Sequence, residues 1–380
     1  MTEYTRFVGF DVSADTMAVA TAEVGRAPAE DAGVLAADPA TVRKWVMRQP
    51  DRATLLVCYE AGPTGFGLYR QLTALGVACR VIAPGLVPTR PTDRLKTDRR
   101  DARHLAEALR AGTLTPIRVP TEAEEAFRDL VRARTMAVQV RQRARQRVKS
   151  ALLRWGIRPP QGLAPWGPAY RAWIRQVAPI PAPRDQVWAE LRSQLDEADA
   201  RVERLTRQVA DAWPQHPLAP LIRAWQALRG VDWLTAATLV AELGDLSSFA
   251  HPRSLMAWVG LVPWEASSGG TRRQGGITKT GNAHLRRILV EAAHSYRFRP
   301  SLRGSVGRRL ALLGPWEPAL SAISWRAQQR LHARLRTLGG RRGQPKALAA
   351  VARELCGFLW EVAVWVRAQP VTPEEVAPVA

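Results

Sequence analysis

Cysteine is scarce in this chain of 380 residues, which has three cysteines. Cys58, Cys79 and Cys356 lie far apart in apolar segments and form no CxxC pair, so neither a zinc site nor a disulfide framework is indicated. No apolar run approaches the length of a membrane-spanning helix, and the amino terminus does not resemble a signal peptide. We therefore expect a cytoplasmic protein that has no membrane partner and keeps its cysteines in the core.

Acidic residues are also few, since 34 Asp and Glu residues stand against 55 Lys and Arg residues, a formal net charge of +21. Most of the excess is arginine, whose planar guanidinium group suits phosphate. A polyanionic partner, nucleic acid above all, is the simplest explanation of such a charge. With 46% hydrophobic residues, a chain of this length is expected to form two or three globular domains.

The first part of the chain has the pattern of an α/β domain. Short apolar strands are expected at 7–12 and 17–22, joined by a tight turn, and again at 55–59 and 77–82. A helix is expected over 66–75, between the last two strands. Strands that alternate with a helix predict an α/β fold for this region.

Four carboxylates stand at informative places in this domain. Asp11 lies at the end of the first strand and Glu60 directly follows the third, where a buried carboxylate is costly unless it is paired or binds a cation. Asp98 and Asp101 are three residues apart and share one face of a helix. Each of them alone could cap a turn or complement a helix dipole. Together they predict a magnesium site suited to phosphoryl transfer.

A stretch rich in glycine, serine and cations, residues 264–287, precedes a helix that Asn282 is expected to cap. Its glycines would bring backbone N–H groups close to an anion, and its cations would supply the opposing charge. The cations that we expect to bind nucleic acid are Arg272, Arg273, Lys279, Arg286 and Arg287. We predict a phosphate-binding loop, although a plain polar turn is the alternative.

Two serines, Ser267 and Ser268, lie on the rim of this stretch. A serine hydroxyl is a poor nucleophile unless a base or a metal activates it, and the nearest candidate bases are Glu265 and His284. If one of these serines reacts, help is expected from elsewhere in the chain.

The middle of the chain is predicted to be helical and basic. One long helix is expected from Glu122 to about Trp155, with eight cations against one acid between Arg128 and Lys149. Four of these cations alternate along the helix and are expected to spread around it: Arg141, Arg143, Arg145 and Arg147. Binding to a nucleic-acid backbone is favoured over a merely solvated face.

A connection rich in proline and tryptophan, residues 159–183, leads to a second helix that ends near Trp213. Its apolar residues alternate spacings of three and four, the heptad pattern of a coiled coil. This seam could pack on the basic helix of the same chain or on a second subunit.

The carboxy-terminal part is predicted to be mainly helical. Residues 221–243 resemble a helix-hairpin-helix element, in which hairpin N–H groups bind a DNA phosphate. Asp232 replaces the usual second hairpin glycine and could cap the following helix, so the element is a better marker of fold than of DNA contact. Residues 316–369 are expected to be helical.

The segment GFDVSADTMAVA, the step from Tyr59 to Gly62 and the segment from Lys96 to Arg103 resemble the amino-terminal DEDD domain of the transposases of the insertion-sequence 110 family. That domain is similar to the Holliday-junction resolvase RuvC and has an RNase H-like fold. The resemblance implies that Asp11, Glu60, Asp98 and Asp101 are catalytic and bind Mg²⁺. Residues 255–263, the Ser-Ser-Gly-Gly sequence and residues 276–287 resemble the second domain of the same transposases.

In that family a serine of the second domain is the nucleophile and forms a covalent phosphoserine link to DNA. The match falls on Ser268, with Ser267 as the adjacent alternative. The resemblance implies a composite site, in which the serine meets the carboxylate-bound magnesium, with halves from one chain or from two subunits of a dimer or tetramer. It also implies a structured non-coding guide RNA as a partner beside DNA, and a place with the bacterial nucleoid.

The sequence thus predicts a RuvC-like domain at 1–120, a basic helical and coiled-coil region at 121–215, a mainly α transposase domain at 216–370 and a loose tail at 371–380. The predicted function is a recombinase that excises and inserts a mobile DNA element by serine transesterification with Mg²⁺. A metal-only junction nuclease and a non-enzymatic nucleic-acid-binding protein are the alternatives.

Overall fold

The computed structural model describes residues 3–84, 87, 97–177, 180–268 and 271–369. The chain divides into two compact units, Met1–Val119 and Pro120–Ala380. Within the described ranges, no helix is both long enough and apolar enough to cross a membrane. The predicted loose tail, residues 371–380, lies outside these ranges.

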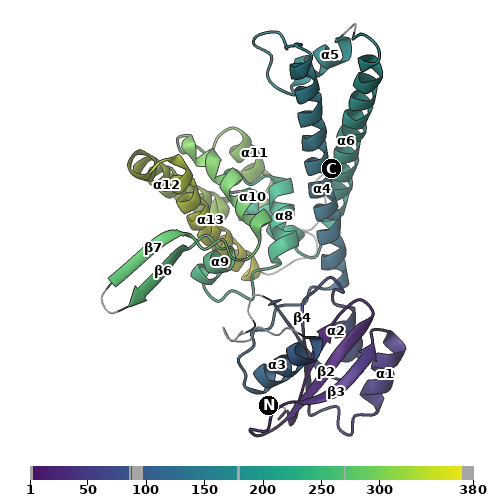
Figure 1. Cartoon of the computed structure of the whole chain (residues 1–380). Helices are drawn as coiled ribbons and strands as arrows, with labels where there is room; N and C mark the ends of the chain where they lie inside the picture. Colours follow the sequence, from purple (N-terminus) through teal and green to yellow (C-terminus); the bar gives the residue numbers. More distant parts are fainter. Residues whose placement is uncertain (1–2, 85–86, 88–96, 178–179, 269–270, 370–380) are drawn as a thin grey trace. The chain divides into compact units, whose positions relative to one another are not determined.

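The first unit is built on a mixed sheet of five strands in the order β3-β2-β1-β4-β5 (Figure 1). The strands are β1 Arg6–Val12, β2 Thr16–Glu23, β3 Glu30–Ala36, β4 Leu55–Glu60 and β5 Ala78–Ile82. Strands β1, β2 and β3 form an antiparallel meander, while β4 and β5 run parallel to β1. Four strands confirm the prediction. Strand β3 was not predicted, because its sequence EDAGVLA mixes acids and glycine and lies at the sheet edge.

Helices cover both faces of this sheet. Helices α1 Pro39–Met47 and α2 Gly67–Ala74 pack on the face that carries Phe10 and Tyr59. Helix α3 Asp98–Arg110 packs on the opposite face, against the small side chains of β2 and the apolar side chains of β4. Helix α2 confirms the prediction, whereas α1 was not predicted.

Helix α3 crosses β1 at Gly9, where the absence of a side chain lets two backbones meet. A Cβ atom at Gly9 would overlap the carbonyl oxygen of Ala102 and lie 2.7 Å from the backbone nitrogen of Ala106. At the end of α3, Arg110 donates to the carbonyl oxygen of Glu23, which pairs with the first residue of β1. The helix therefore runs antiparallel to β1, and its first turn lies toward the carboxyl end of that strand.

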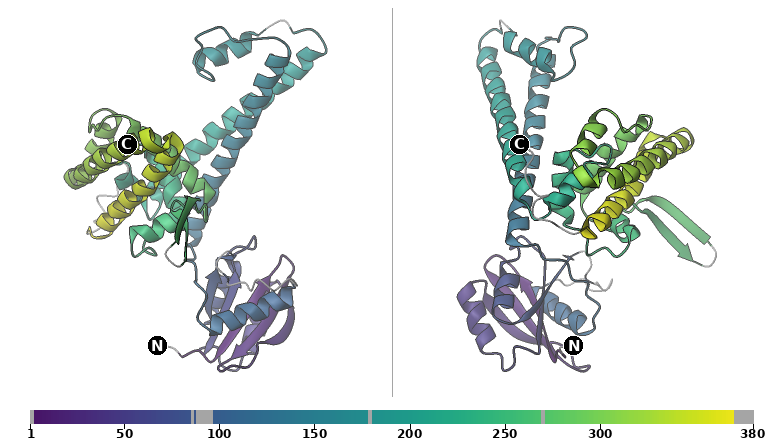
Figure 2. Two further views of the ribbon diagram at one scale, coloured as in Figure 1. Left: turned by 60° about the vertical axis from the view of Figure 1, so that its left-hand side comes forward. Right: turned by 180° about the vertical axis from the view of Figure 1, so that it is seen from behind.

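The second unit begins with two long helices that pack side by side (Figure 2). They are α4 Glu122–Arg154 and α6 Arg184–Ala212, joined through the short helix α5 Pro168–Gln176. We call these three helices the helical arm. The heptad seam of α6 packs on α4 of the same chain, with Ala198 and Leu195 in one apolar cluster with Val148. Helix α5 was not predicted, because its proline-rich surroundings resemble a loop.

The remaining helices of the second unit form a bundle around a buried tryptophan. They are α7 Ala219–Trp225, α8 Trp233–Leu243, α9 Pro252–Trp258, α10 Ala283–Ala293, α11 Ser305–Ala311, α12 Glu317–Arg342 and α13 Gln344–Arg367. Trp225 has no exposed surface and donates its indole N–H to the carbonyl oxygen of Leu359 at 2.9 Å. Asp232 caps α8 by accepting from the backbone N–H of Thr235 at 2.7 Å.

The glycine-rich stretch predicted as a loop is a β-hairpin that extends from this bundle (Figures 1 and 2). Its strands are β6 Pro263–Ser268 and β7 Thr271–Ile277, and residues 269–270 lie outside the described ranges. The prediction was wrong here because glycine has low strand propensity and clusters of serine and glycine are typical of loops. Cross-strand contacts compensate, since the Trp264 ring lies against Gly275, and Gln274 donates to Glu265 at 2.9 Å.

Candidate active site

Two of the predicted carboxylates lie near the carboxyl ends of adjacent parallel strands, on one face of the sheet. Phe10 of β1 pairs with Tyr59 of β4, so the next residues, Asp11 and Glu60, are level. Side chains alternate along a strand, and Phe10 and Tyr59 face α1 and α2. Asp11 and Glu60 therefore belong to the opposite face, which α3 covers, and both are half-buried.

The other two carboxylates lie in the first turn of α3, which points toward the same end of β1. Asp98 is the first residue of the helix and is exposed, while Asp101 is half-buried. Thr97 caps the helix through its backbone carbonyl, which accepts from the N–H group of Asp101 at 3.0 Å. The fold thus brings the four predicted positions to one end of one face, although they come from three separate segments.

The side chains as placed are not gathered into a metal cage. In the part of the chain that the structure describes, no group of three or more His, Cys, Asp or Glu residues is arranged to hold a metal ion. The donor set itself, four carboxylates near two strand ends and a helix N-terminus, is the hard oxygen chemistry that Mg²⁺ requires. The metal assignment of Asp11, Glu60, Asp98 and Asp101 stays a prediction.

The hairpin places the predicted nucleophile at its far end. Ser268 is the last residue of β6, and its backbone pairs with Thr271 at the turn, while Ser267 pairs with Arg272. The side chains of Ser267, Ser268 and Arg272 lie outside what the structure describes. Both serines therefore belong to the β6-β7 hairpin and not to the helix that Asn282 caps.

The predicted cations of this stretch are divided between the two ends of the hairpin. Arg273 is exposed near the tip, opposite Ala266, whereas Lys279 is exposed just beyond the base. Because a strand rises about 3.3 Å per residue, the four steps of β7 from Arg273 to Ile277 already span about 13 Å, and Lys279 follows two residues after the strand ends. The sequence predicted a single basic loop. In the structure, the cations are instead divided between the tip of the hairpin and the end at which it joins the bundle.

At the base, Arg286 and Arg287 have different surroundings. One guanidinium nitrogen of Arg286 donates to the carbonyl oxygens of Val259, Thr280 and Gly281, so this side chain holds the strand-to-helix connection together. Arg287 is exposed and pairs with Glu291 at 3.1 Å. A phosphate contact by Arg286 would have to use its remaining N–H groups.

The four predicted arginines of α4 also differ from one another. Arg143 is exposed. Arg147 is exposed and donates to Gln194 of α6 at 3.2 Å. Arg141 and Arg145 are four residues apart and face α6, where they approach Asp199. The alternating spacing was expected to spread these cations around the helix, and the observed environments agree with that expectation.

A buried carboxylate that sequence reasoning missed joins α4 to the base of the hairpin. The Glu242 side chain is only 3% exposed and accepts two hydrogen bonds of 2.8 Å from Arg132. It also accepts from the side-chain amide of Asn282 at 2.8 Å. Asn282 in turn caps α10 by accepting from the backbone N–H of His284 at 2.9 Å. Sequence reasoning missed this pair because Glu242 lies near the end of an apolar helix and Arg132 is far away in sequence, so no local pattern joins them.

This network favours a charged Glu242 and a neutral His284. Burial opposes ionisation of Glu242, but hydrogen bonding and the charge of Arg132 outweigh it and hold the pKa of this carboxyl below its ordinary value. Burial, and then the nearby charge of Arg287, lower the pKa of His284. The ring of His284 lies 3.1 Å from Arg287 through Nδ1 and 3.5 Å from the Thr135 hydroxyl through Nε2.

We expect Glu242→Gln to lower the free energy of unfolding by about 2 kcal/mol at neutral pH, because it leaves Arg132 without its buried partner. The matched control is Glu203→Gln on α6, whose exposed carboxylate pairs with Arg207 and which should change stability by less than about 0.5 kcal/mol. Because the folded pKa of Glu242 is lowered, the difference from the wild type should disappear as the pH falls through that pKa. Urea denaturation of the three proteins at two pH values measures both effects, and equal shifts for the two variants would contradict the assignment.

Two cavities lined by described residues of the bundle contain none of the predicted site residues in their lining. The larger cavity, about 570 Å³, is lined by the turn that connects α7 to α8 and by the start of α11. Its lining includes Arg229, Arg303 and Arg309. Arg229 donates to the carbonyl oxygens of Phe298, Arg299 and Ser301, so its described contacts hold that segment in place.

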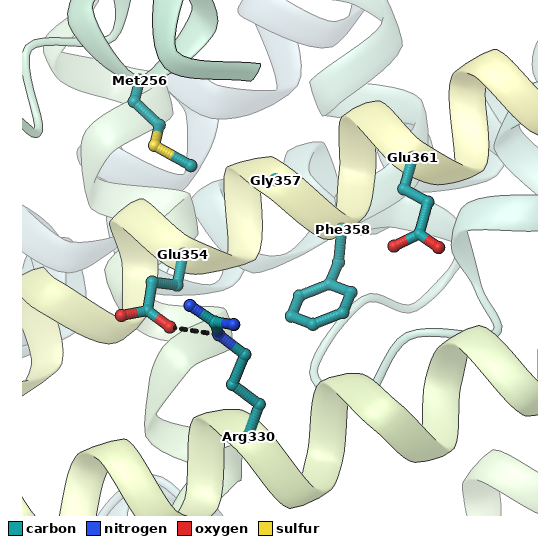
Figure 3. Close-up of a pocket in the computed structure, with 6 residues that line it drawn as sticks. All are labelled: Met256, Arg330, Glu354, Gly357, Phe358 and Glu361. Carbon is teal, nitrogen blue, oxygen red and sulfur yellow. Dashed lines mark hydrogen bonds and ion pairs between the residues drawn. The ribbon is translucent and has the colours of Figure 1, made fainter. Parts of the chain in front are cut away.

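The smaller cavity, about 250 Å³, lies beside α12 and α13 (Figure 3). Its lining includes Arg330, which pairs with Glu354 at 2.8 Å, and Glu361, which pairs with Arg326. The remaining lining residues, Met256, Gly357 and Phe358, are uncharged. The charged groups of this cavity are thus paired within the protein, and it resembles a packing gap more than a reaction site.

Comparison with known families matches both halves of the chain. A family model described as Transposase, for the DEDD domain of the IS110 group, matches residues 8–156. A second model, described as Transposase IS116/IS110/IS902 family, matches residues 223–305. A DEDD transposase domain implies an RNase H-like fold, and the mixed sheet with helices on both faces agrees with it.

Curated relatives extend the similarity over almost the whole chain. The chain is 41% identical to the putative transposase y4qE of Sinorhizobium fredii, over 94% of this chain and 88% of the relative. It is 30% identical to the transposase for insertion sequence element IS1533 of Leptospira borgpetersenii, over 76% of this chain and 82% of the relative. It is 32% identical to a probable family 20 transposase of Pseudomonas aeruginosa, over 63% of this chain and 70% of the relative.

Proposed function

Because the chain belongs to the IS110 family of transposases, we propose that it excises and inserts its mobile element through a serine nucleophile. Family membership makes the chain an enzyme that binds DNA and acts in transposition. The DEDD domain suggests the use of a divalent metal. The proposal adds the identity of the nucleophile, the metal and its four ligands.

The observation that carries the proposal is the convergence in the first unit. Asp11 and Glu60 are level on adjacent strands, and the helix that crosses Gly9 begins with Asp98 at their end of the sheet. These three residues and Asp101 would hold Mg²⁺. When bound, that ion stabilises the negative charge of a phosphoryl transition state and favours the ionised form of an oxygen nucleophile.

Ser268 is proposed to carry the covalent step. Its hydroxyl oxygen forms a bond to the phosphorus of a DNA phosphodiester, and the bond from that phosphorus to one sugar oxygen breaks. The serine gives up its proton to a base, and the sugar oxygen leaves as a hydroxyl after taking up a proton. The phosphoserine link preserves a reactive ester bond, so a second sugar hydroxyl can reverse the step and join new strands.

The cations are proposed to hold the nucleic acids. Arg272 and Arg273 belong to strand β7 of the hairpin that presents Ser268, and Lys279 follows this strand. The alternating arginines of α4 lie on the helical arm. A structured RNA encoded by the element is the proposed guide to donor and target DNA. The proposed assembly is a homo-oligomer.

The test is to incubate the protein with element-end DNA, the flanking RNA and Mg²⁺, and to look for a protein–DNA adduct on a denaturing gel. We expect an adduct that EDTA abolishes, that restored Mg²⁺ recovers and that depends on the RNA. Cleaved DNA without any adduct would point to a metal-only nuclease. Bound but intact DNA would point to a protein that binds nucleic acid without cutting it.

A further inference from the structure

On α6, the single carboxylate of Asp199 faces three arginines in the middle of the helical arm. Arg145 of α4 approaches it at 3.3 Å, Arg171 of α5 at 3.6 Å and Arg141 of α4 at 3.8 Å. Only the contact of Arg145 has hydrogen-bond geometry in the described structure. Three positive charges therefore surround one negative charge, which leaves a local surplus of two.

This surplus is held where water compensates it poorly. The side chains of Arg145 and Arg141 are only 14% and 24% exposed. Burial is the main reason why the pKa values of both arginines are lowered, and the neighbouring arginines lower them further. Within the described residues, the Nε atom of Arg145 is buried without a hydrogen-bond partner. Such a cluster is costly unless an anion accepts from it.

An aromatic wall fixes the geometry of the cluster. The guanidinium group of Arg145 lies 5.1 Å above the ring of Trp166, and Arg171 donates its Nε–H to the carbonyl oxygen of Trp166 at 3.2 Å. Trp166 has a φ of 63°, a left-handed conformation that residues other than glycine rarely adopt. Its ring also packs against Tyr170 in a tilted arrangement, with centroids 5.1 Å apart. Trp166 thus positions Arg145 through its ring and Arg171 through its backbone carbonyl.

The cluster is open on the side of α5. Arg171 is 41% exposed and Asp199 is 23% exposed, so a large anion can reach them from solvent. A phosphodiester carries its charge on two oxygens, as a carboxylate does, and guanidinium groups bind both in the same planar fork. Nucleic acid is the partner that supplies such anions to an enzyme that acts on DNA.

We propose that Arg141, Arg145 and Arg171 form a binding site for one nucleic-acid phosphate, and that Asp199 occupies this site as an internal substitute until the phosphate displaces it. The proposal adds Arg171 to the nucleic-acid-binding residues, Trp166 as a residue that positions the arginines, and Asp199 as the competitor of the phosphate. It rests on the proposed function in one respect, that the helical arm binds nucleic acid. Asp199 weakens that binding because the phosphate must compete with it, and in return it keeps the three arginines compatible with a stable free protein.

The test compares Asp199→Asn with Asp196→Asn, since both residues lie on α6 and both changes remove one negative charge. Asp196 is exposed and one turn away. Asp199→Asn should bind nucleic acid about tenfold more tightly than the wild type, and the slope of log affinity against log salt should steepen by about one. Asp196→Asn should change affinity by about twofold or less. Single-stranded RNA and duplex DNA of equal length, measured separately, identify which nucleic acid supplies the phosphate.

A second pair of variants keeps the proposal testable if Asp199→Asn folds poorly. Arg171→Gln should weaken binding by about tenfold, whereas Arg175→Gln, an exposed arginine one turn further along α5, should have little effect. In the double variant, Arg171→Gln should cancel the gain of Asp199→Asn. Equal affinities within each pair would overturn the proposal. A separate variant tests the proposed nucleic-acid role of the helical arm and replaces both exposed arginines, Arg143→Gln and Arg147→Gln, in one protein. If its affinity for nucleic acid equalled that of the wild type, that role would itself be wrong.

Discussion

Ser268→Ala should abolish the covalent adduct between protein and element-end DNA, with a loss of recombination on the order of 10⁵-fold. The loss is large because alanine removes the only atom that can bond to phosphorus, and deletion of a serine nucleophile costs about this much in enzymes that use one. Ser268 is the last residue of β6, at the far end of the β6-β7 hairpin, and its backbone pairs with Thr271. The variant should therefore fold and bind DNA as the wild type does.

The control for this prediction is Ser267→Ala. Ser267 is the neighbouring residue in β6 and the alternative nucleophile, so this variant makes the same chemical change one residue away. Ser267→Ala should keep most of the adduct. Loss of the adduct in Ser267→Ala alone would move the nucleophile to the neighbouring residue. A normal adduct in both single variants would end the serine mechanism.

Asp11→Asn should reduce cleavage and adduct formation by about a thousandfold. Asparagine keeps the shape of the side chain but removes the negative charge that a bound Mg²⁺ requires, and lost metal stabilisation of a phosphoryl transition state costs several kcal/mol. The half-buried side chain lies on the face that α3 covers, level with Glu60. The concentration of Mg²⁺ needed for half-maximal adduct formation should rise together with the loss of rate.

Asp15→Asn is the matched control, because Asp15 is an exposed acid in the turn that follows β1. It should leave the metal requirement unchanged. Binding of Mn²⁺, followed by electron paramagnetic resonance, gives a readout that does not depend on DNA cleavage. It should weaken in Asp11→Asn and not in Asp15→Asn. If both variants bound Mn²⁺ and cut DNA as the wild type does, Asp11 would have no place in the metal site.

The sequence predicted the sheet of the first unit well where apolar residues alternate or run together. The strands predicted at 7–12, 17–22, 55–59 and 77–82 agree with the observed bounds within one residue at every end. Strand β3 was missed because an edge strand faces solvent and needs little apolar character. The same local reasoning failed on the β6-β7 hairpin, where Gly275 disfavours a strand until the Trp264 ring covers it.

By itself, the sequence determined which residues can do chemistry and in which order they follow. Carboxylates at strand ends, a serine among glycines and arginines without balancing acids are properties of composition and spacing, which local rules can read. Spacing of four residues already placed Arg141 and Arg145 on one side of α4.

Only the tertiary structure decided which of these residues meet. Gly9 admits α3 close enough to β1 to bring Asp98 and Asp101 toward Asp11, and nothing near Gly9 in the sequence indicates this contact. Glu242 reaches Arg132, and Asp199 reaches Arg171, across separations that no helical or strand period covers. Such pairs depend on how whole elements pack, because each buried charge is tolerated only where the fold supplies its partner.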